Sequence, residues 1–373
     1  MLILIPGYLL FIALLFFTAV LLFYYCYFFA RLVFYKKKEK TSSQEHPVSM
    51  IVCGKNEAAN FAKNIPGLIF QEYKTSHQIL VVNDNSEDNS AAILEALNAR
   101  YHCLTVVNLQ QKALHIPGKK YPLSVGIREA IHEILLLTDA DCVPATEFWL
   151  QKMQEPYDEA VEIVLGYGAY HKYPGFLNKV IRYETFHSAL QYLSYALAGI
   201  PYMGVGRNLS YRKSLFLEHK GFSDINHLPG GDDDLFINKV ATKLNTAIVI
   251  EPEAHTLSSP KRTWTEWKKQ KTRHFSTSKY YKFNHKILLG LYSLSHFLFY
   301  FLLIATCIWF DWRAGLTILV VKSIAQQLIF STVMKRLNEA DLRKWILLLD
   351  LWMVFYYLFF APMLIKKEKK TWN

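Results

Sequence analysis

The sequence predicts an α/β fold with a mostly parallel sheet, placed between long apolar segments near both ends of the chain. Apolar residues make up 52% of its 373 residues and are concentrated in those terminal segments. The stretch 47–260 is more polar, and in it short β-branched runs alternate with helical stretches. Strands that are apolar along their whole length and alternate with helices indicate a parallel sheet covered on both faces.

The N-terminal segment predicts a membrane anchor over residues 1–35. No charged side chain occurs before Arg31, which leaves more than the roughly 20 apolar residues that a spanning helix needs. Lys36–Lys38 follow the apolar run, whereas a secretory signal peptide carries its positive charge before that run. We therefore expect an uncleaved anchor with the next domain in the cytoplasm.

The C-terminal region, 286–366, predicts two to three further spans. Segments 287–310 and 345–365 are strongly apolar, whereas 314–334 is weaker because Lys322, Gln326 and Gln327 lie inside it. Three C-terminal spans would place the C-terminus outside, but the basic run 366–370 favours the inside. The number of spans and the side of the C-terminus stay open.

Residues 261–285 predict an amphipathic helix at the membrane surface, because cations alternate there with Trp264 and Trp267. The formal charge of +11 is concentrated at 36–40, 261–286 and 366–370, each beside an apolar segment. That placement favours anionic lipid headgroups over nucleic acid as the partner. Five cysteines without a Cys-x-x-Cys pair fit a reducing compartment with neither zinc ribbon nor disulfide framework.

The polar domain, 47–260, contains four predicted parallel strands. Helices are expected from near Glu57, after Ser86 as an N-cap, and over 122–133. Ligands of such sheets bind at the carboxyl ends of the strands. The predicted strands cover 48–53, 78–84, 104–109 and 134–139.

Acidic residues follow three of these strands: Glu57 the first, Asp84 the second, and Asp139 and Asp141 the fourth. Each alone could be an ordinary turn residue. Together they indicate a cation site, since an Asp-x-Asp pair offers hard oxygen ligands to Mg²⁺ or Mn²⁺, which can in turn hold a nucleotide diphosphate. The glycine-rich motifs of dinucleotide and P-loop sites are absent.

The chain resembles the membrane-bound family 2 glycosyltransferases, which are inverting enzymes of GT-A fold that use nucleotide-activated sugars. The resemblance covers residues 47–280 and the terminal spans in outline. It is carried by six motifs in family order: "VSMIVCGKNEAANF", "ILVVNDNSEDNS", "GKKYPLSVGI", "LLLTDADC", "GGDDDLF" and "QKTRH".

This resemblance implies roles for the acidic residues of the sheet edge. Glu57 and Asp84 would contact the ribose and base of the nucleotide, and Lys119 the diphosphate, with Lys120 as a substitute. Asp139 would contact the nucleotide and help to hold the cation, for which Asp141 is the main ligand. The segment 204–213 matches one that lines the acceptor cleft, or is a glycine-rich turn into a helix.

The "GGDDDLF" stretch would supply the general base, because inversion needs a carboxylate on the face opposite the leaving diphosphate. The register of the resemblance gives Asp232, with Asp233 as its rival and Asp234 as a helix cap. Gly231 stands where the family often has Glu, which places this register in doubt.

Gln270 and Arg273 match the Gln-x-x-Arg-Trp signature, in which Arg stabilises the diphosphate. His274 occupies the Trp position, which weakens the case for a processive enzyme and leaves an interfacial residue as the simple interpretation. The resemblance implies transfer of a UDP- or GDP-linked sugar to a lipid or glycan acceptor in cell-envelope synthesis, at a bacterial inner membrane. A processive polysaccharide synthase and an inactive membrane scaffold are the alternatives.

Overall fold

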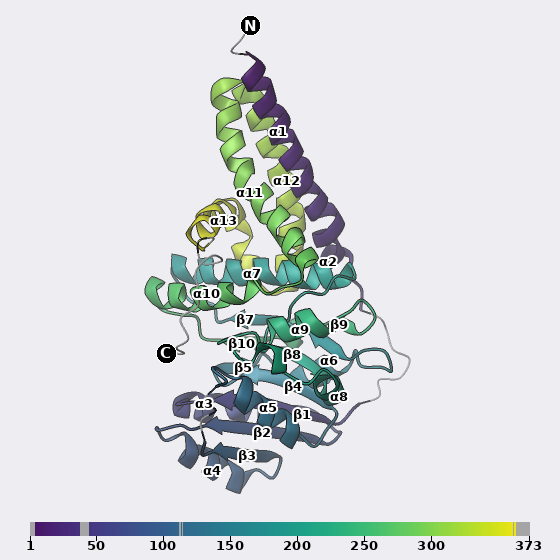
Figure 1. Cartoon of the computed structure of the whole chain (residues 1–373), viewed down its shortest axis with the longest axis vertical. Coiled ribbons are helices and arrows are strands. Elements are labelled where there is room, and N and C mark those ends of the chain that lie inside the picture. Colours follow the sequence, from purple (N-terminus) through teal and green to yellow (C-terminus); the bar gives the residue numbers. More distant parts are fainter. Residues whose placement is uncertain (1–3, 38–44, 112, 114, 361, 363–373) are drawn as a thin grey trace.

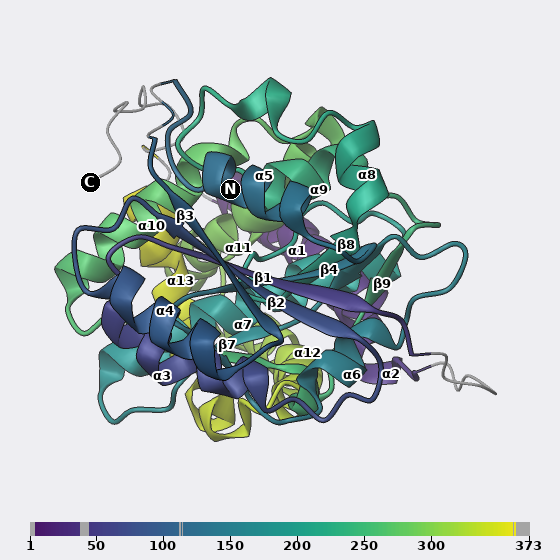
Figure 2. The ribbon, with the colours of Figure 1, turned by 90° about the horizontal axis from the view of Figure 1, so that it is seen from below.

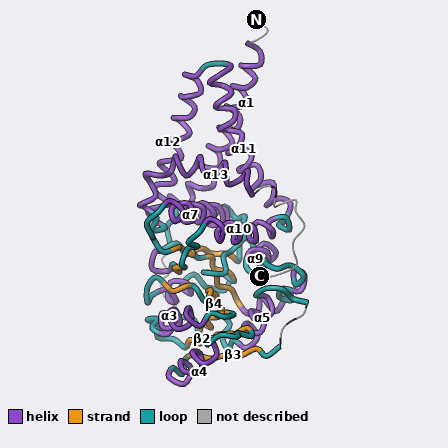
Figure 3. Tube along the Cα trace, turned by 90° about the vertical axis from the view of Figure 1, so that its left-hand side faces the viewer, coloured by secondary structure: helices purple, strands orange, loops and turns teal. Residues whose placement is uncertain are grey.

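The computed structural model describes residues 4–37, 45–111, 113, 115–360 and 362. It has three layers: a bundle of long helices, a layer of helices lying across its base, and a domain with a large β-sheet (Figure 1). Figure 3 shows the strands confined to the end of the molecule away from the bundle. Of the basic clusters, positions 38–40 and 366–370 lie outside the described residues.

The helices and strands follow one another in the order expected for alternating units. The strands are β1 (Val48–Gly54), β2 (His77–Asp84), β3 (Leu104–Leu109), β4 (Ile134–Asp139), β5 (Cys142–Pro144), β6 (Ile163–Leu165), β7 (Gly168–Tyr170), β8 (Leu209–Arg212), β9 (Thr246–Ile248) and β10 (Thr256–Ser258). The α-helices are α1 (Leu4–Phe23), α2 (Ala30–Phe34), α3 (Ala58–Ile69), α4 (Ser90–Arg100), α5 (Lys120–Glu129), α6 (Trp149–Gln154), α7 (Phe176–Leu197), α8 (Lys213–Glu218), α9 (Asp234–Val240), α10 (Trp264–Ser278), α11 (Phe283–Trp309), α12 (Trp312–Arg336) and α13 (Ile346–Phe360). A π-helical stretch, η1 (Tyr24–Phe29), joins α1 to α2, and short 3₁₀ turns are η2 (Ser223–Ile225), η3 (Pro252–Ala254) and η4 (Ala340–Trp345).

The main sheet has the strand order β3-β2-β1-β4-β8-β6-β9. Only β8 runs antiparallel to its neighbours, so the predicted mostly parallel sheet is confirmed. The four predicted strands are also confirmed, each to within one residue at either end. A smaller sheet with the order β5-β10-β7 lies beside it.

Helices cover both faces of the parallel part of the sheet. In Figure 2, α3 and α4 lie on one side of β1 and β2, and α5 lies on the other. Successive residues of β1 alternate between the two cores, with Met50 facing Phe61 and Ile65 of α3, and Ile51 facing Leu123 of α5. Each such fully buried side chain contributes about 1.5–3 kcal/mol to folding.

The prediction that Ser86 caps the second helix is wrong. That helix, α4, begins at Ser90, and its N-cap residue is Asn89. The Ser86 hydroxyl instead accepts a 2.8 Å hydrogen bond from the backbone N–H of Asn56, in the loop after β1. The segment after β2 is therefore used to brace the neighbouring strand end, where unpaired backbone N–H groups need acceptors.

Among the described residues, three helices are long and apolar enough to cross a membrane: Gly7–Phe34, Phe283–Trp309 and Trp312–Arg336. They form the bundle of Figure 1. The segment with the weaker apolar signal forms the 25-residue helix α12, and the next segment forms α13 over Ile346–Phe360. Positions 361 and 363–365 of that predicted span lie outside the described residues. Helix α13 lies beside the base of the bundle (Figure 1).

Polar residues of α12 explain why it is long despite its composition. Lys322 and Gln326 are fully buried and both donate hydrogen bonds to the carboxylate of Asp350 in α13, over 2.5 and 2.6 Å. His296 and Tyr300 of α11 contact the same carboxylate at 3.0 and 2.6 Å. These groups face one another rather than the exterior, which removes the cost of exposing them to an apolar medium.

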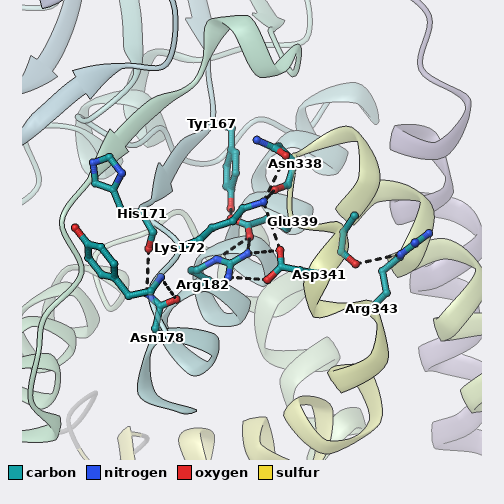
Figure 4. A network of polar contacts seen from close by, with 11 residues as sticks. Tyr167, His171, Lys172, Asn178, Arg182, Asn338, Glu339, Asp341 and Arg343 are labelled. Atoms are coloured by element: carbon teal, nitrogen blue, oxygen red, sulfur yellow. Dashed lines mark hydrogen bonds and ion pairs between the residues drawn. The ribbon is translucent and has the colours of Figure 1, made fainter. Parts of the chain in front are cut away.

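A second network joins the sheet domain to the bundle (Figure 4). Arg182 of α7 donates hydrogen bonds to both Glu339 and Asp341, which follow α12. Tyr167, directly before β7, donates a 3.1 Å hydrogen bond to Glu339. Lys172 reaches the carbonyl of Asn338 at 2.6 Å. Because Arg182 and Glu339 are each about 2% exposed, this contact fixes the two parts of the chain to each other.

Candidate active site

The parallel strands bring the predicted acidic residues to one edge of the sheet. Cys53 at the end of β1 is the register partner of Asp139 at the end of β4. Asp84 ends β2, on the other side of β1. Glu57 stands at the N-cap position of α3, just past β1. The structure thus gathers the residues predicted from the sequence at the carboxyl edge, where α/β sheets bind ligands.

The two lysines of the "GKK" motif have different environments. Lys119 forms an ion pair with Asp139, and both side chains are 31% exposed. Lys120 is fully buried, and its ammonium donates hydrogen bonds to the carbonyls of Leu228 and Gly230. Lys120 therefore anchors the loop that leads to the "GGDDDLF" stretch, so only Lys119 lies where a diphosphate could reach it.

The two carboxylates of the Asp-x-Asp pair are electrostatically inequivalent. Burial opposes ionisation of Asp139, but the ion pair with Lys119 holds its pKa below the usual value. Burial, followed by the negative charge of Asp139, raises the pKa of Asp141. Asp141 thus carries a charge that its surroundings leave largely uncompensated, the situation in which a carboxylate gains most from a cation.

The donor set at this point suits a hard divalent cation. Ligand atoms of Asp139, Asp141 and Cys142 lie within 4.8 Å of one another. The Cys142 thiol is 1% exposed, and burial raises its pKa, so it stays a neutral thiol rather than a metal-binding thiolate. Two carboxylates without a thiolate fit Mg²⁺ or Mn²⁺ better than Zn²⁺.

The three aspartates of "GGDDDLF" each have a different environment. Asp232 lines a pocket that also contains Lys119, Thr138 and Gly206. Among the described residues, the carboxylate of Asp232 accepts no hydrogen bond and forms no ion pair. It is therefore the member of the three that remains available to a ligand.

Asp233 is the N-cap residue of α9, which corrects the assignment of that role to Asp234. Its carboxylate accepts hydrogen bonds from the backbone N–H groups of Asp234, at 2.7 Å, and Gly206, at 2.8 Å. Burial, together with the negative charges of Asp232 and Asp234, raises its pKa to about 8. Capping needs an acceptor one residue before the helix, and here the helix starts at Asp234.

Asp234 joins α9 to the helices that lead to the bundle. Its carboxylate is 7% exposed and accepts hydrogen bonds from the hydroxyls of Thr277, at 2.5 Å, and Tyr281, at 2.8 Å. Thr277 belongs to α10 and Tyr281 lies in the turn before α11. In the sequence, this role of Asp234 is indicated only by the three consecutive Asp residues, since capping one helix requires a single Asp.

Gly231 has a structural reason to be glycine. Its φ of +98° lies in the region that only glycine adopts readily, and an added Cβ would lie 2.6 Å from the side chain of Leu235. The Glu often found here in the resembling family would therefore need a different loop. This explains the departure from the family pattern without moving the register of the following aspartates.

Helix α10 carries Gln270 and Arg273 along the edge of the site. A capping box formed by Thr263 and Glu266 starts the helix. Gln270 donates a 3.4 Å hydrogen bond to the Tyr170 hydroxyl. Arg273 is exposed, and its positive charge helps to lower the pKa of Asp139, after the larger effect of Lys119. The structure therefore places α10 next to the carboxylates, as expected.

Arg207 is a site residue that the sequence analysis did not single out. It lies in the "GVGRNLSYRK" segment, and its charge acts on both Asp139 and Asp141. Its position directly after Gly206, in a motif that matches the acceptor cleft, was the sequence feature that could have indicated Arg207 as a site residue. Two adjacent carboxylates also require cations beyond one lysine.

A mostly parallel sheet with an Asp-x-Asp pair, a lysine and a further carboxylate at its carboxyl edge defines a GT-A domain. Residues 49–219 match the family described as Glycosyl transferase family 2. This match lies within the GT-A domain, which has long apolar helices on both sides.

Two curated proteins with glycosyltransferase names are similar to this chain. Glycosyltransferase AglE of Haloferax volcanii is 25% identical over 191 residues, which cover 50% of this chain and 58% of that protein. Probable glycosyltransferase YdaM of Bacillus subtilis is 25% identical over 242 residues, or 61% of this chain and 54% of that protein. The chain spans between half and three fifths of the length of these relatives.

A solved structure shows a similar fold over nearly the whole chain. It is the mannosyltransferase PcManGT of Pyrobaculum calidifontis in complex with GDP-Man and Mn²⁺. Its TM-score is 0.58 at 18% identity, covering 92% of this chain and 99% of that one. The similarity therefore extends beyond the GT-A domain to the helices of the bundle and the layer at its base.

Proposed function

We propose that the protein transfers a sugar, with inversion, from a nucleotide diphosphate donor to an acceptor held at the membrane. The observation that supports this most is the pocket shared by Lys119 and Asp232. The pocket contains a cation paired with the Asp-x-Asp edge and a carboxylate that accepts no hydrogen bond and forms no ion pair among the described residues. A leaving diphosphate and an attacking hydroxyl need groups of these two kinds on opposite sides.

The donor side of the site uses residues of the sheet edge. Glu57 and Asp84, at the ends of β1 and β2, bind the nucleoside, and Lys119 and Arg273 attract the diphosphate. Asp141 and Asp139 hold Mg²⁺ or Mn²⁺, which supplies positive charge to the leaving diphosphate when bound. Mn²⁺ and GDP-mannose, which the Pyrobaculum mannosyltransferase contains, are suitable first ligands to test.

The acceptor side uses Asp232 as general base. Its carboxylate takes the proton from the acceptor hydroxyl as that oxygen attacks the anomeric carbon and the bond to the diphosphate breaks. Asp233 is less suited to this role, because both its oxygens already accept backbone hydrogen bonds. With a pKa near 8 it is also largely protonated at neutral pH.

The membrane arrangement follows from the number of long helices. With α1, α11 and α12 as spans, the sheet domain, between the first and second span, and α13, after the third, lie on the same side. We place that side in the cytoplasm, because Arg31, Lys36 and Lys37 follow the first span.

A donor-hydrolysis and transfer assay tests the proposed function. The purified full chain, with Mn²⁺ and either GDP-mannose or a UDP-linked sugar, should release nucleoside diphosphate, and a lipid extract should increase the rate. A scaffold of the same fold would bind neither donor and release nothing. Absence of release with every GDP- and UDP-linked sugar tried would contradict the proposal.

A further inference from the structure

Arg207 is held in a fixed position between the two sides of the site. Its neighbour Gly206 donates a 2.8 Å hydrogen bond to Asp233, in the base-containing stretch. The carbonyl of Arg207 accepts hydrogen bonds from the hydroxyls of Thr138, at 3.0 Å, and Thr256, at 2.9 Å. Thr138 directly precedes the Asp-x-Asp pair, so this segment connects both halves of the pocket.

The guanidinium of Arg207 is also oriented in advance. It lies 4.3 Å from the centre of the Tyr170 ring, and Nη1 donates a 3.3 Å hydrogen bond to Ser258. Gly168 leaves the space for it, since a Cβ there would lie 3.1 Å from Cβ and 3.3 Å from Nε of Arg207. An arginine stacked on a ring loses less freedom when it binds an anion than a free side chain does.

A chain of polar contacts links this guanidinium to the Asp-x-Asp pair. Ser258 contacts the Cys142 thiol at 2.8 Å, and that thiol contacts Asp141 at 3.5 Å. Among the described residues, no carboxylate lies within ion-pair distance of Arg207. Within the part of the chain that the structure describes, one of its five N–H donors has a protein acceptor, so the others remain for a ligand.

The charges of the site then balance in a specific way. Lys119 is paired with Asp139, and Arg207 is the positive charge that compensates Asp141 most. A divalent cation taken up by these carboxylates leaves both positive side chains in excess, which favours an anion at the same place. We propose that Arg207 is a donor-binding residue that contacts the diphosphate of the nucleotide sugar.

This assignment rests on the proposed function and predicts effects of opposite sign. Removing the charge of Arg207 takes a donor away from the diphosphate, and charge-assisted hydrogen bonds of this kind change affinity about tenfold to a hundredfold. The same change makes the carboxylate edge more negative, so the affinity for Mn²⁺ alone should stay the same or increase. A purely structural arginine would instead weaken both ligands together.

The experiment uses the full chain in detergent and two probes. Mn²⁺ binding is measured alone by the loss of the free-ion paramagnetic resonance signal, and GDP and UDP binding by calorimetry with Mn²⁺ present. For Arg207→Gln, which can still donate to Ser258, we expect the nucleotide Kd to rise about tenfold to a hundredfold. For Arg207→Lys, which keeps the charge but loses the planar fork, we expect a smaller rise.

Arg212→Gln is the matched control. Arg212, the last residue of β8, likewise lies over an aromatic ring, that of Tyr157 at 5.5 Å, but its side chain donates hydrogen bonds to the carbonyls of Val161 and Asp158. It should therefore leave both Kd values unchanged. Equal nucleotide binding by wild type and both Arg207 variants, or a parallel loss of Mn²⁺ and nucleotide binding, would overturn the assignment. Failure of the wild type to bind either nucleotide would instead overturn the proposed function.

Discussion

The hydroxyl of Thr277 donates a 2.5 Å hydrogen bond to the buried carboxylate of Asp234. This contact connects α10, which carries Arg273, with the stretch that carries Asp232. The proposed base, Asp232, is two residues from Asp234, and the proposed diphosphate contact, Arg273, is four residues from Thr277. The hydrogen bond between Asp234 and Thr277 therefore links the two elements that carry them. Catalysis is sensitive to such ties, because a displacement of about 1 Å can reduce a rate a hundredfold.

Thr277→Val tests this tie. The variant keeps the shape of the side chain but leaves one oxygen of Asp234 with a single donor, Tyr281. We expect kcat to fall about tenfold while the donor KM changes little, since Asp234 has no direct place in nucleotide binding. Thr272→Val is the control, because its hydroxyl only returns to the carbonyl of Lys268. Equal kcat in both variants would show that the tie is irrelevant to transfer.

The identity of the base is tested by single substitutions in "GGDDDLF". Asp232→Asn should retain Mn²⁺ and nucleotide binding but lose about 10²- to 10⁴-fold in transfer, the usual contribution of a positioned base. Asp233→Asn should keep most activity, because an asparagine oxygen can still cap α9. Stopped transfer in Asp233→Asn together with activity in Asp232→Asn would shift the base by one residue.

Metal dependence is tested by Asp141→Asn. Removing this charge leaves the Asp-x-Asp edge with one carboxylate, which Lys119 already neutralises. We expect Mn²⁺ to stop enhancing nucleotide binding, whereas the melting temperature should stay the same or rise, because Asp141 is destabilised by Asp139. Calorimetry with and without Mn²⁺ measures the effect. Unchanged metal enhancement would contradict the assignment of the metal ligands.

The network around Arg182 predicts a strong effect on stability. Arg182→Met leaves Glu339 buried without its cation, which costs about 3–5 kcal/mol of the free energy of unfolding. The double variant with Glu339→Leu should recover part of this loss. Thermal unfolding of the detergent-solubilised chain compares them, and a single variant as stable as the wild type would show that the network contributes little.

The same network predicts a loss of stability in acid. The hydrogen bond from Arg182 and its charge lower the pKa of Asp341 from 3.8 to about 2. A group with a depressed pKa in the folded state stabilises fully above its unfolded pKa and loses that contribution as the pH falls towards the folded value. We therefore expect Asp341→Asn to flatten the decline in melting temperature between pH 4 and pH 2. An identical decline in both proteins would exclude this contribution.

Labelling of introduced cysteines tests the orientation in the membrane. Asn98→Cys lies on the exposed side of α4 in the sheet domain, and Arg313→Cys is exposed in the first turn of α12, just after the turn from α11. In intact cells an impermeant reagent should modify only the second. Modification of Asn98→Cys under these conditions would reverse the proposed orientation.

Local pattern was sufficient for much of the fold. The β-branched runs ending at Gly54, Asp84 and Asp139 placed three central strands, because buried parallel strands have an apolar signal of their own. The same rule brought Glu57, Asp139 and Asp141 together, since carboxyl ends of parallel strands share an edge.

Pairing at long range could not be predicted. Asp233 and Asp234 differ only in what their oxygens meet, Gly206 in one case and Thr277 in the other. Likewise, hydropathy alone predicts that the helix containing Lys322 is a weak span. Lys322 is paired with Asp350, which lies 28 residues later and therefore outside any local hydropathy window.

The packing of the N-terminal helix also has a consequence for synthesis. The hydroxyl of Tyr24 donates a hydrogen bond to the carbonyl of Leu288 in α11. The first apolar helix therefore meets α11 only after roughly 250 further residues have been made. At about 5–20 residues per second, a ribosome needs on the order of 10–50 s for that interval. During this time the face of α1 that packs against α11 has no partner helix, and another nascent chain could occupy it. A polypeptide that ends within the sheet domain lacks α11, so this face stays exposed permanently. We expect such fragments to be removed by membrane proteases.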